Sequence, residues 1–339
     1  YLVLSLETGS IKRSRNVRFD NEPNLSESEE SMSKMESGLI AEVDDTPSVK
    51  ECLSGARKDE WVKAIREEYE NMTSHNVWEK VELSEGQRYI NSMLIMRVKR
   101  DANGNEVRLK ARLVALGNHQ RYGADYSETF APTLKEKTLL ILMALCNDKS
   151  YLIEHMDVDG AYLNADLKED IVMKVPSPID EWTGSQFVKL KKALYGLKQA
   201  GHEWNACFTE HLLNLGYEQA ERDRCLFHRN DEVGRKLFVL IYVDNIILMA
   251  PDSDHMNEMK QEIASKFATK DLGEIKHILG IGVKRDWEKG EIVLDQEAAV
   301  SRFVCEFDNL ICRDTPLHAR SARELKKSRE TADTMSIRK

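Results

Sequence analysis

The stretch KLFVLIYVDNIILMA, residues 236–250, decides the fold of this chain. It consists of two apolar runs rich in β-branched residues, interrupted only by Asp244 and Asn245 near its centre. Such runs are typical of strands buried on both faces of a sheet, and a short polar break between them is typical of a tight hairpin. Removing a carboxylate from water is costly unless it gains a partner. The two polar residues at the tip of this hairpin therefore need an explanation.

The segments around this hairpin alternate between predicted helices and strands. KEKTLLILMALC at 135–146 predicts a buried helix, and YLIEHMDV at 151–158 predicts the strand that follows it. Helices are predicted again over 193–215 and over about 253–268. The order strand, helix, hairpin, helix is the split βαβ arrangement, in which the end of the first strand and the tip of the hairpin become neighbours. We therefore expect Asp157 to lie beside that tip.

Further elements are predicted towards both ends. Ser48 can cap a helix, and apolar residues at helical spacing follow it and predict a helix to about residue 72. Asn103-Gly104 lies between two basic, β-branched runs and predicts a hairpin, as does Lys289-Gly290 in a later segment. A last helix is predicted over about 296–309.

The amino-acid composition indicates a protein with a sizeable hydrophobic core and a short acidic N-terminal segment. Hydrophobic residues make up 41% of the 339, and no apolar run is long enough for a membrane span, so we expect no membrane partner. Residues 1–46 are rich in Ser, Glu and Asn and predict a disordered acidic linker. The six scattered cysteines predict reduced thiols in an intracellular protein.

The charge of the chain is unevenly distributed. The formal net charge is −9, yet residues 96–121 hold seven Lys or Arg against two acids, and residues 189–198 hold four lysines and no acid. Basic runs are most often solvated faces, and residues 313–339, with eight bases against four acids, fit that description. For the first two runs, the interpretation depends on what lies near them.

Asp157 and Asp244 suit a divalent cation. Two carboxylates on adjacent strands repel each other, so such a pair is normally retained to bind metal. Two Mg²⁺ ions held about 4 Å apart are the standard device for in-line phosphoryl transfer. The alternative is that both are ordinary turn residues, for which aspartate is common, and spacing alone favours that alternative.

Six segments of the chain, in order, resemble the reverse transcriptase of Ty1/copia-type LTR retrotransposons. They are WVKAIREEYENMTSHNVWEKV (61–81), VRLKARLVALGNHQRYGADYSETFAPT (107–133), HMDVDGAYLNADLKEDIVMKVP (155–176), VKLKKALYGLKQAGHEW (188–204), LFVLIYVDNIILMA (237–250) and DLGEIKHILGIGV (271–283). The resemblance implies an α+β right-hand polymerase core. Its fingers are expected over 47–150, its palm over 151–250, the rest of the palm and the start of a thumb over 251–312, and a frayed or truncated tail over 313–339.

The resemblance also implies roles for individual residues. The catalytic positions are Asp157, Asp244 and Asn245. Asp157 and Asp244, with the backbone of Val158, are expected to hold two Mg²⁺ ions, for which Mn²⁺ is a possible substitute. Nucleotide binding is expected from side chains in three motifs, namely Lys110, Arg112, Tyr162, Tyr195, Gly196, Lys198 and Gln199. Tyr162 is expected beneath the incoming sugar, where an aromatic ring would clash with a 2′-hydroxyl. A core tyrosine at a strand–helix junction is the alternative.

The same resemblance implies partners and a location. An RNA or DNA template with its primer, and dNTPs, are the expected ligands. The integrase and RNase H segments of a full-length element are expected as partners, since the chain carries neither. A cytoplasmic virus-like particle or the nucleus is the implied location.

One departure from the family pattern bears on activity. The family carries YVDD at the hairpin tip, whereas this chain has YVDN, with Asn245 in place of the third carboxylate. A neutral amide does not help to neutralise bound cations. Two other readings therefore stay open, a nucleic-acid-binding pseudoenzyme and a non-functional relic of a truncated copy. Asp159, two residues after Asp157, is a possible substitute acid, with a surface turn aspartate as its alternative.

Overall fold

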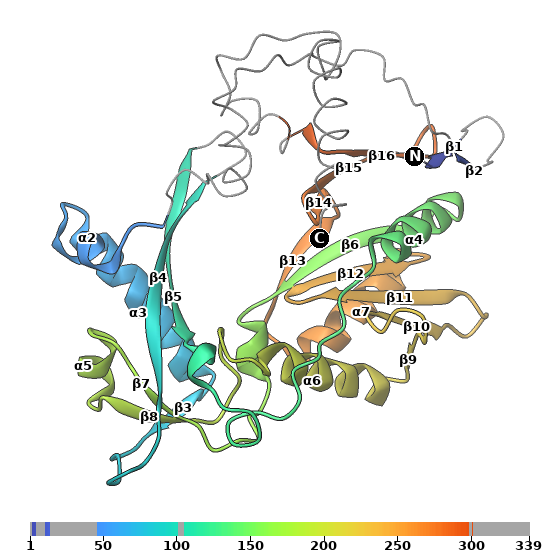
Figure 1. The fold of residues 1–339 in the computed structure, drawn as a ribbon. Helices are drawn as coiled ribbons and strands as arrows, with labels where there is room; N and C mark the ends of the chain where they lie inside the picture. The colour runs from blue at the N-terminus through green and yellow to red at the C-terminus, as the bar shows by residue number, and fades with distance from the viewer. Residues whose placement is uncertain (1, 5–10, 14–45, 101–104, 298–299, 301–339) are drawn as a thin grey trace, which may run out of the picture. The chain divides into compact units, whose positions relative to one another are not determined.

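The computed structural model describes residues 2–4, 11–13, 46–100, 105–297 and 300 (Figure 1). Residues 44–298 form one compact unit, and the terminal segments form another. In the latter, β1 (Leu2–Leu4) pairs antiparallel with β2 (Ile11–Arg13). The predicted linker, the predicted helix over 296–309 and the predicted tail lie, apart from these strands and a few residues at their borders, outside the described residues.

The larger unit is built around a six-stranded antiparallel sheet in the order β13-β6-β12-β11-β10-β9 (Figure 1). Its strands are β6 (Leu152–Val158), β9 (Glu218–Gln219), β10 (Leu226–Asn230), β11 (Lys236–Tyr242), β12 (Asn245–Ala250) and β13 (Thr269–Glu274). The predicted strand at 151–158 and the predicted hairpin at 236–250 are confirmed as the central strands β6, β11 and β12. All residues of β12 after Asn245 are buried, because both faces of the sheet are covered.

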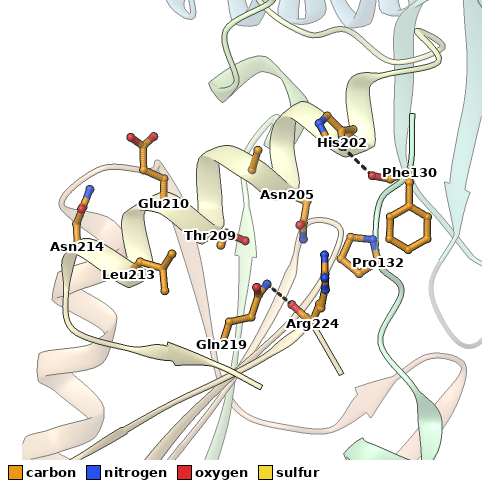
Figure 2. Close-up of a pocket in the computed structure, with 11 residues that line it drawn as sticks. Phe130, Pro132, His202, Asn205, Thr209, Glu210, Leu213, Asn214, Gln219 and Arg224 are labelled. Carbon is orange, nitrogen blue, oxygen red and sulfur yellow. Dashed lines mark hydrogen bonds between the residues drawn. The ribbon is translucent and has the colours of Figure 1, made fainter. Parts of the chain in front are cut away.

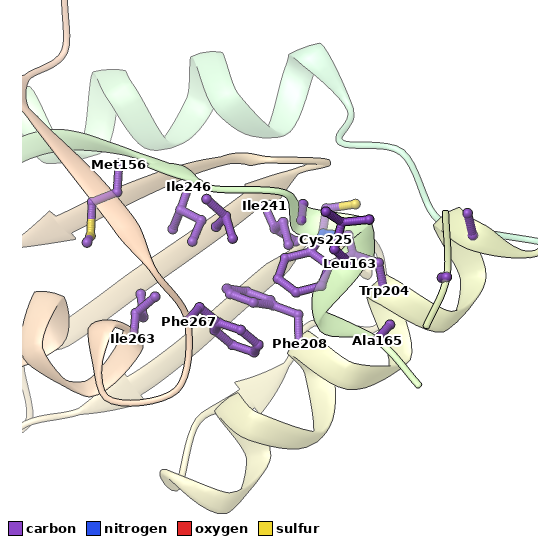
Figure 3. Close-up of a cluster of buried hydrophobic side chains, with 14 of the residues drawn as sticks. Met156, Leu163, Ala165, Trp204, Phe208, Cys225, Ile241, Ile246, Ile263 and Phe267 are labelled. Carbon is purple, nitrogen blue, oxygen red and sulfur yellow. The ribbon is translucent and has the colours of Figure 1, made fainter. Parts of the chain in front are cut away.

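Helices cover the two faces. On one face, α4 (Glu136–Asp148) contacts β6, and its Cys146 Sγ lies 3.4 Å from Met249 Sδ. On the other, aromatic and aliphatic side chains of α6 (Ala200–Asn214) and of α7 (Ser253–Ala264) and the residues after it pack on the sheet (Figure 3). Phe208 and Phe267, whose ring centroids lie 5.7 Å apart, are the centre of that layer. Side chains alternate along a strand, so Asn245 lies on the same face as Met249.

A five-stranded sheet, in the order β3-β8-β7-β4-β5, carries the basic hairpin. Its strands are β3 (Trp78–Lys80), β4 (Ile90–Arg100), β5 (Glu106–Ala115), β7 (Val172–Lys174) and β8 (Phe187–Leu190). The pairing of β4 with β5 confirms the hairpin predicted from Asn103-Gly104, although residues 101–104 themselves lie outside the described residues. β5 is an edge strand, and α3 (Lys58–Ser74) contacts it.

The remaining elements are short. A three-stranded antiparallel sheet, β14-β15-β16, confirms the hairpin predicted around Lys289-Gly290. These elements are β14 (His277–Ile278), β15 (Ile281–Asp286), β16 (Glu291–Asp295), α2 (Val49–Ser54), α5 (Ile179–Thr183) and the 3₁₀ turns η2 (Gly117–His119) and η3 (Ala161–Asn164). Within the described ranges, no helix has the length and apolar character to cross a membrane.

Two predicted helices are wrong in extent. The helix predicted from Ser48 to residue 72 is two helices, because α2 ends before the extended residue Gly55, whose N–H donates to Glu51 O at 2.9 Å. The helix predicted over 193–215 begins only at Ala200. The preceding residues form a loop because Gly196 has a φ of +91°, which a helix does not allow.

Candidate functional site

The tip of the central hairpin is the turn Val243-Asp244. Tyr242 and Asn245 are the last paired residues of β11 and β12, so the turn lies one residue earlier than the polar break predicts. Asn245 is therefore a strand residue with a defined direction, and Asp244 occupies the turn itself.

Neighbouring elements hold this turn in place. Trp204 Nε1 of α6 donates a hydrogen bond to Val243 O at 2.6 Å, and Val158 N at the end of β6 donates to Asp244 O at 2.8 Å. Val243 has a φ of +57°, a conformation that costs a β-branched residue about 1–3 kcal/mol. Strained backbone held by surrounding contacts is typical of functional sites.

Asp157 lies directly opposite Asn245 on the neighbouring strand β6. This register confirms that the chain segments carrying Asp157 and Asp244 adjoin one another in one antiparallel sheet. Burial, followed by the negative charges of Asp244 and Asp159, raises the pKa of the Asp157 carboxyl. A bound cation would relieve this repulsion, so the donor set of two carboxylates fits a divalent ion.

A histidine that the sequence analysis did not single out completes the tip. His155 Nε2 lies 2.8 Å from Asn245 Oδ1, and Asn245 Nδ2 lies 2.8 Å from Asp244 Oδ1. The signal was present in the sequence, because His155 precedes Asp157 by two residues and so shares its strand face.

Two tyrosines and an arginine pack against one another beside the carboxylates. The rings of Tyr162 in η3 and Tyr195 lie 4.7 Å apart, and the Arg112 guanidinium lies 4.5 Å from the Tyr195 ring centroid. Burial raises the pKa of Tyr195 to about 12, so this hydroxyl stays protonated at neutral pH. Burial and the negative charge of Asp244 raise the pKa of Tyr162, which also indicates that the tyrosine is near the hairpin tip.

Lys110 and Arg112 lie on the same side of β5 and near a buried acid. Glu68 of α3 is only 8% exposed, and its Oε1 accepts a hydrogen bond from Leu113 N at 3.0 Å, on the open edge of β5. Burial raises the pKa of Glu68 despite the nearby positive charges of both cations. Burial and the charge of Arg112 lower the pKa of Lys110. Glu68 is a supporting residue that sequence periodicity does not reveal.

The loop that carries Tyr195 lies directly against the end of β5. A Cβ on Gly196 would lie 2.0 Å from Ala115 O, and one on Gly117 would lie 2.2 Å from Gly196 O. Ala115 N donates to Tyr195 O at 2.8 Å. Glycine at both positions permits this backbone contact.

Lys198 and Gln199 differ in their surroundings. Lys198 is exposed, and its Nζ lies 3.1 Å from Tyr126 Oη. Gln199 is fully buried. Its Nε2 donates to Asp125 O at 2.8 Å, and its Oε1 accepts from Gln120 Nε2 at 2.9 Å. Gln199 therefore supports the loop from inside rather than facing a ligand, because its amide is already satisfied.

The part of the chain that the structure describes contains no group of three or more His, Cys, Asp or Glu side chains arranged for a metal ion. Asp157 and Asp244 supply two acids, and the neutral Asn245 occupies the third position. A pocket of about 430 Å³ lies elsewhere, between α6 and neighbouring segments that include Phe130 and Arg224 (Figure 2). None of the predicted site residues lines it.

Comparison with known proteins agrees with this arrangement. Residues 75–317 match the family model described as reverse transcriptase (RNA-dependent DNA polymerase). The chain is 31% identical over 271 residues to the retrovirus-related Pol polyprotein from transposon TNT 1-94 of Nicotiana tabacum, covering 80% of this chain and 20% of that protein. It is 33% identical over 235 residues to the Pol polyprotein from transposon RE1 of Arabidopsis thaliana, covering 68% and 16%.

A yeast relative extends the comparison. The transposon Ty1-DR5 Gag-Pol polyprotein of Saccharomyces cerevisiae is 28% identical over 290 residues, which cover 78% of this chain and 16% of that protein. The chain thus spans a fifth or less of the length of these relatives. The match covers most of this chain, and the chain belongs to the reverse transcriptase (RNA-dependent DNA polymerase) family, with Ty1/copia-type Pol polyproteins as its relatives.

Proposed function

We propose that the chain is the polymerase part of a Ty1/copia-type retrotransposon Pol polyprotein and that it extends a DNA primer on an RNA or DNA template. The observation that carries the proposal is the register that sets Asp157 opposite Asn245, with Asp244 beside it. In this proposal residues 47–150 are the fingers, 151–250 the palm, and 251–312 the rest of the palm and the start of a thumb.

The proposed roles follow from the positions of the side chains. Asp157 and Asp244, with the backbone of Val158, hold the divalent cation. Mg²⁺ bound there would activate the primer 3′-hydroxyl and stabilise the leaving group. Lys110 and Arg112 hold the triphosphate, for which fixed cations are the natural partners. Both side chains are half-buried, and the buried Glu68 lies near enough to feel both positive charges, which favours this assignment over a solvated basic face.

The aromatic pair selects the sugar in this proposal. Tyr162 lies beneath the incoming nucleotide, and its contact with Tyr195 limits the room for a 2′-hydroxyl. Gly196 lets the backbone approach the nucleotide, and exposed Lys198 lies beside it. The remaining Pol segments, integrase and RNase H, are proposed partners within a full-length element.

Primer extension tests the proposal. On poly(rA)/oligo(dT) with Mg²⁺ or Mn²⁺, the full chain is expected to incorporate dTTP at a low rate. Asp157→Asn is expected to lower that rate by about 100-fold or more, because electrostatic groups at a reacting centre commonly supply at least that factor. Asp166→Asn, which alters an exposed aspartate on a nearby segment, is the control and is expected to extend normally. Equal rates for the unmodified chain and Asp157→Asn would contradict the proposal.

A second function is favoured by Asn245, namely duplex binding without chemistry. Binding depends on phosphate neutralisation and so on salt, not on three acids. We expect affinity for a primer–template duplex to fall steeply between low and physiological salt. Replacing Lys110 and Arg112 together by alanine is expected to make the slope of log affinity against log salt shallower. The slope should change by about 0.9 for each phosphate that the protein no longer neutralises.

Fluorescence anisotropy over a salt series measures this slope. The double variant Lys58→Ala and Lys63→Ala removes the same charge from exposed positions on α3 and is the matched control. An unchanged slope in the Lys110 and Arg112 variant would remove these residues from the binding surface. Absence of duplex affinity at low salt would contradict both proposed functions.

A further inference from the structure

The hydrogen-bond chain from His155 through Asn245 to Asp244 has a direction that elementary chemistry fixes. The carboxylate of Asp244 only accepts hydrogen bonds, so the group 2.8 Å from it must be the amide nitrogen of Asn245. The amide oxygen then faces His155, and it only accepts as well. Nε2 of His155, at 2.8 Å, therefore carries the proton that it donates.

Strand geometry explains why these side chains meet. Asn245 pairs directly with Asp157, and His155 pairs with Ile247. His155 is thus the diagonal neighbour of Asn245 on the same sheet face, within reach of a side chain of its length. Both are partly buried, so the hydrogen bonds between them are partly shielded from competing water.

This geometry makes Asn245 a poor metal ligand. One of the two lone pairs of the oxygen that it would offer a cation already accepts from His155, and its nitrogen points at Asp244. One oxygen of Asp244 is held by that nitrogen, and the carboxylate is thereby fixed in orientation. Groups that orient metal-binding carboxylates typically contribute 10–100-fold to metal affinity.

Resting on the proposed function, we propose that Asn245 and His155 act together as positioning residues that fix the Asp244 carboxylate for one divalent cation, and that Asn245 is not itself a ligand. The asparagine is then not merely a missing acid. It is one member of a matched pair whose other member is His155.

The two roles of Asn245 predict opposite effects at His155. If Asn245 positions Asp244, then His155→Phe releases the amide and weakens Mn²⁺ binding, by about tenfold. If Asn245 is a ligand, the same change frees its oxygen, and Mn²⁺ binds equally well or more tightly. His155→Gln retains an N–H donor and is expected to keep most of the wild-type affinity.

Mn²⁺ titration of the full chain, followed by electron paramagnetic resonance of the free ion, measures these affinities. The variant with Asp157→Asn and Asp244→Asn gives the background, and circular dichroism with urea unfolding verifies folding of each variant. Asn245→Leu is expected to weaken Mn²⁺ binding by about as much as His155→Phe. The double variant is expected to bind Mn²⁺ little more weakly than either single variant, because each substitution breaks the same series of hydrogen bonds.

The outcomes separate this inference from the proposed function. Binding by the unmodified chain no tighter than background overturns the cation site itself. Binding above background that His155→Phe leaves unchanged or strengthens overturns the positioning role alone. A loss in His155→Phe that His155→Gln does not restore also overturns it, because the donor would then be irrelevant. Should His155→Phe fail to fold, the non-additivity is measured between His155→Gln and Asn245→Leu, and full additivity overturns the proposal.

Discussion

Asn245→Asp is expected to raise Mg²⁺-dependent primer extension by about 100-fold or more. The added carboxylate supplies the negative charge that a second cation needs, and each 1.4 kcal/mol of regained transition-state stabilisation is about tenfold in rate. His155 Nε2 retains an acceptor at this position, because a carboxylate oxygen replaces the amide oxygen. The change also removes the N–H that Asn245 donates to Asp244, and the expected gain is net of that loss of about tenfold. Single-turnover extension at saturating Mg²⁺ measures the effect.

The alternative to this prediction is that Asp159 already supplies the third acid. Its charge reaches Asp157, but its side chain is exposed. If the unmodified chain already extends primers well and Asp159→Asn abolishes that activity, Asp159 is the substitute acid and Asn245→Asp will add little. If neither the unmodified chain nor Asn245→Asp extends a primer, changes elsewhere have disabled the polymerase.

Gly196→Ala is expected to lower the free energy of unfolding by about 3 kcal/mol or more. Backbone strain and overpacking act together here, because the residue has a φ of +91° and its new Cβ would lie 2.0 Å from a backbone oxygen of Ala115. A backbone atom has little freedom to give way. Urea unfolding followed by tryptophan fluorescence measures the loss.

Gly234→Ala is the matched control for the Gly196 prediction. Gly234 has a similar φ of +83°, but nothing lies within 4 Å of the position of its added Cβ. Gly234→Ala is expected to lower the free energy of unfolding by about 1 kcal/mol, from the left-handed backbone conformation alone. Equal losses in the two variants would show that the close approach to Ala115 contributes nothing.

The sequence predicts the central sheet well because its signals are local. The strand ending at Asp157 and the hairpin at 236–250 follow from continuous apolar runs with a polar break. The turn is displaced by one residue, since Trp204 donates to Val243 O and Val158 N donates to Asp244 O. These bonds stabilise a turn in which Val243 has a φ that its residue type disfavours. Local preference does not anticipate such tertiary support.

The supporting residues of the site were harder to predict for the same reason. Glu68 lies on a helix and bonds to Leu113, 45 residues away, and His155 bonds to Asn245, 90 residues away. Helical periodicity explains the burial of one face but not the polar partner found there. Gln199 shows the converse error, because motif position predicts a ligand contact where the structure has a buried amide pair.

The contact between the end of β5 and the loop at 193–199 has a mechanical consequence. Two glycine backbones touch there, and the Ala115 N–H is bonded to Tyr195 O, so neither segment has room to slide past the other. Arg112, three residues before Ala115, must then travel with the Tyr195 ring that it covers. Any opening or closing of the basic hairpin would carry the aromatic pair along with the cation. Under the proposed function, a nucleotide held between them would then meet its sugar and triphosphate contacts at the same moment.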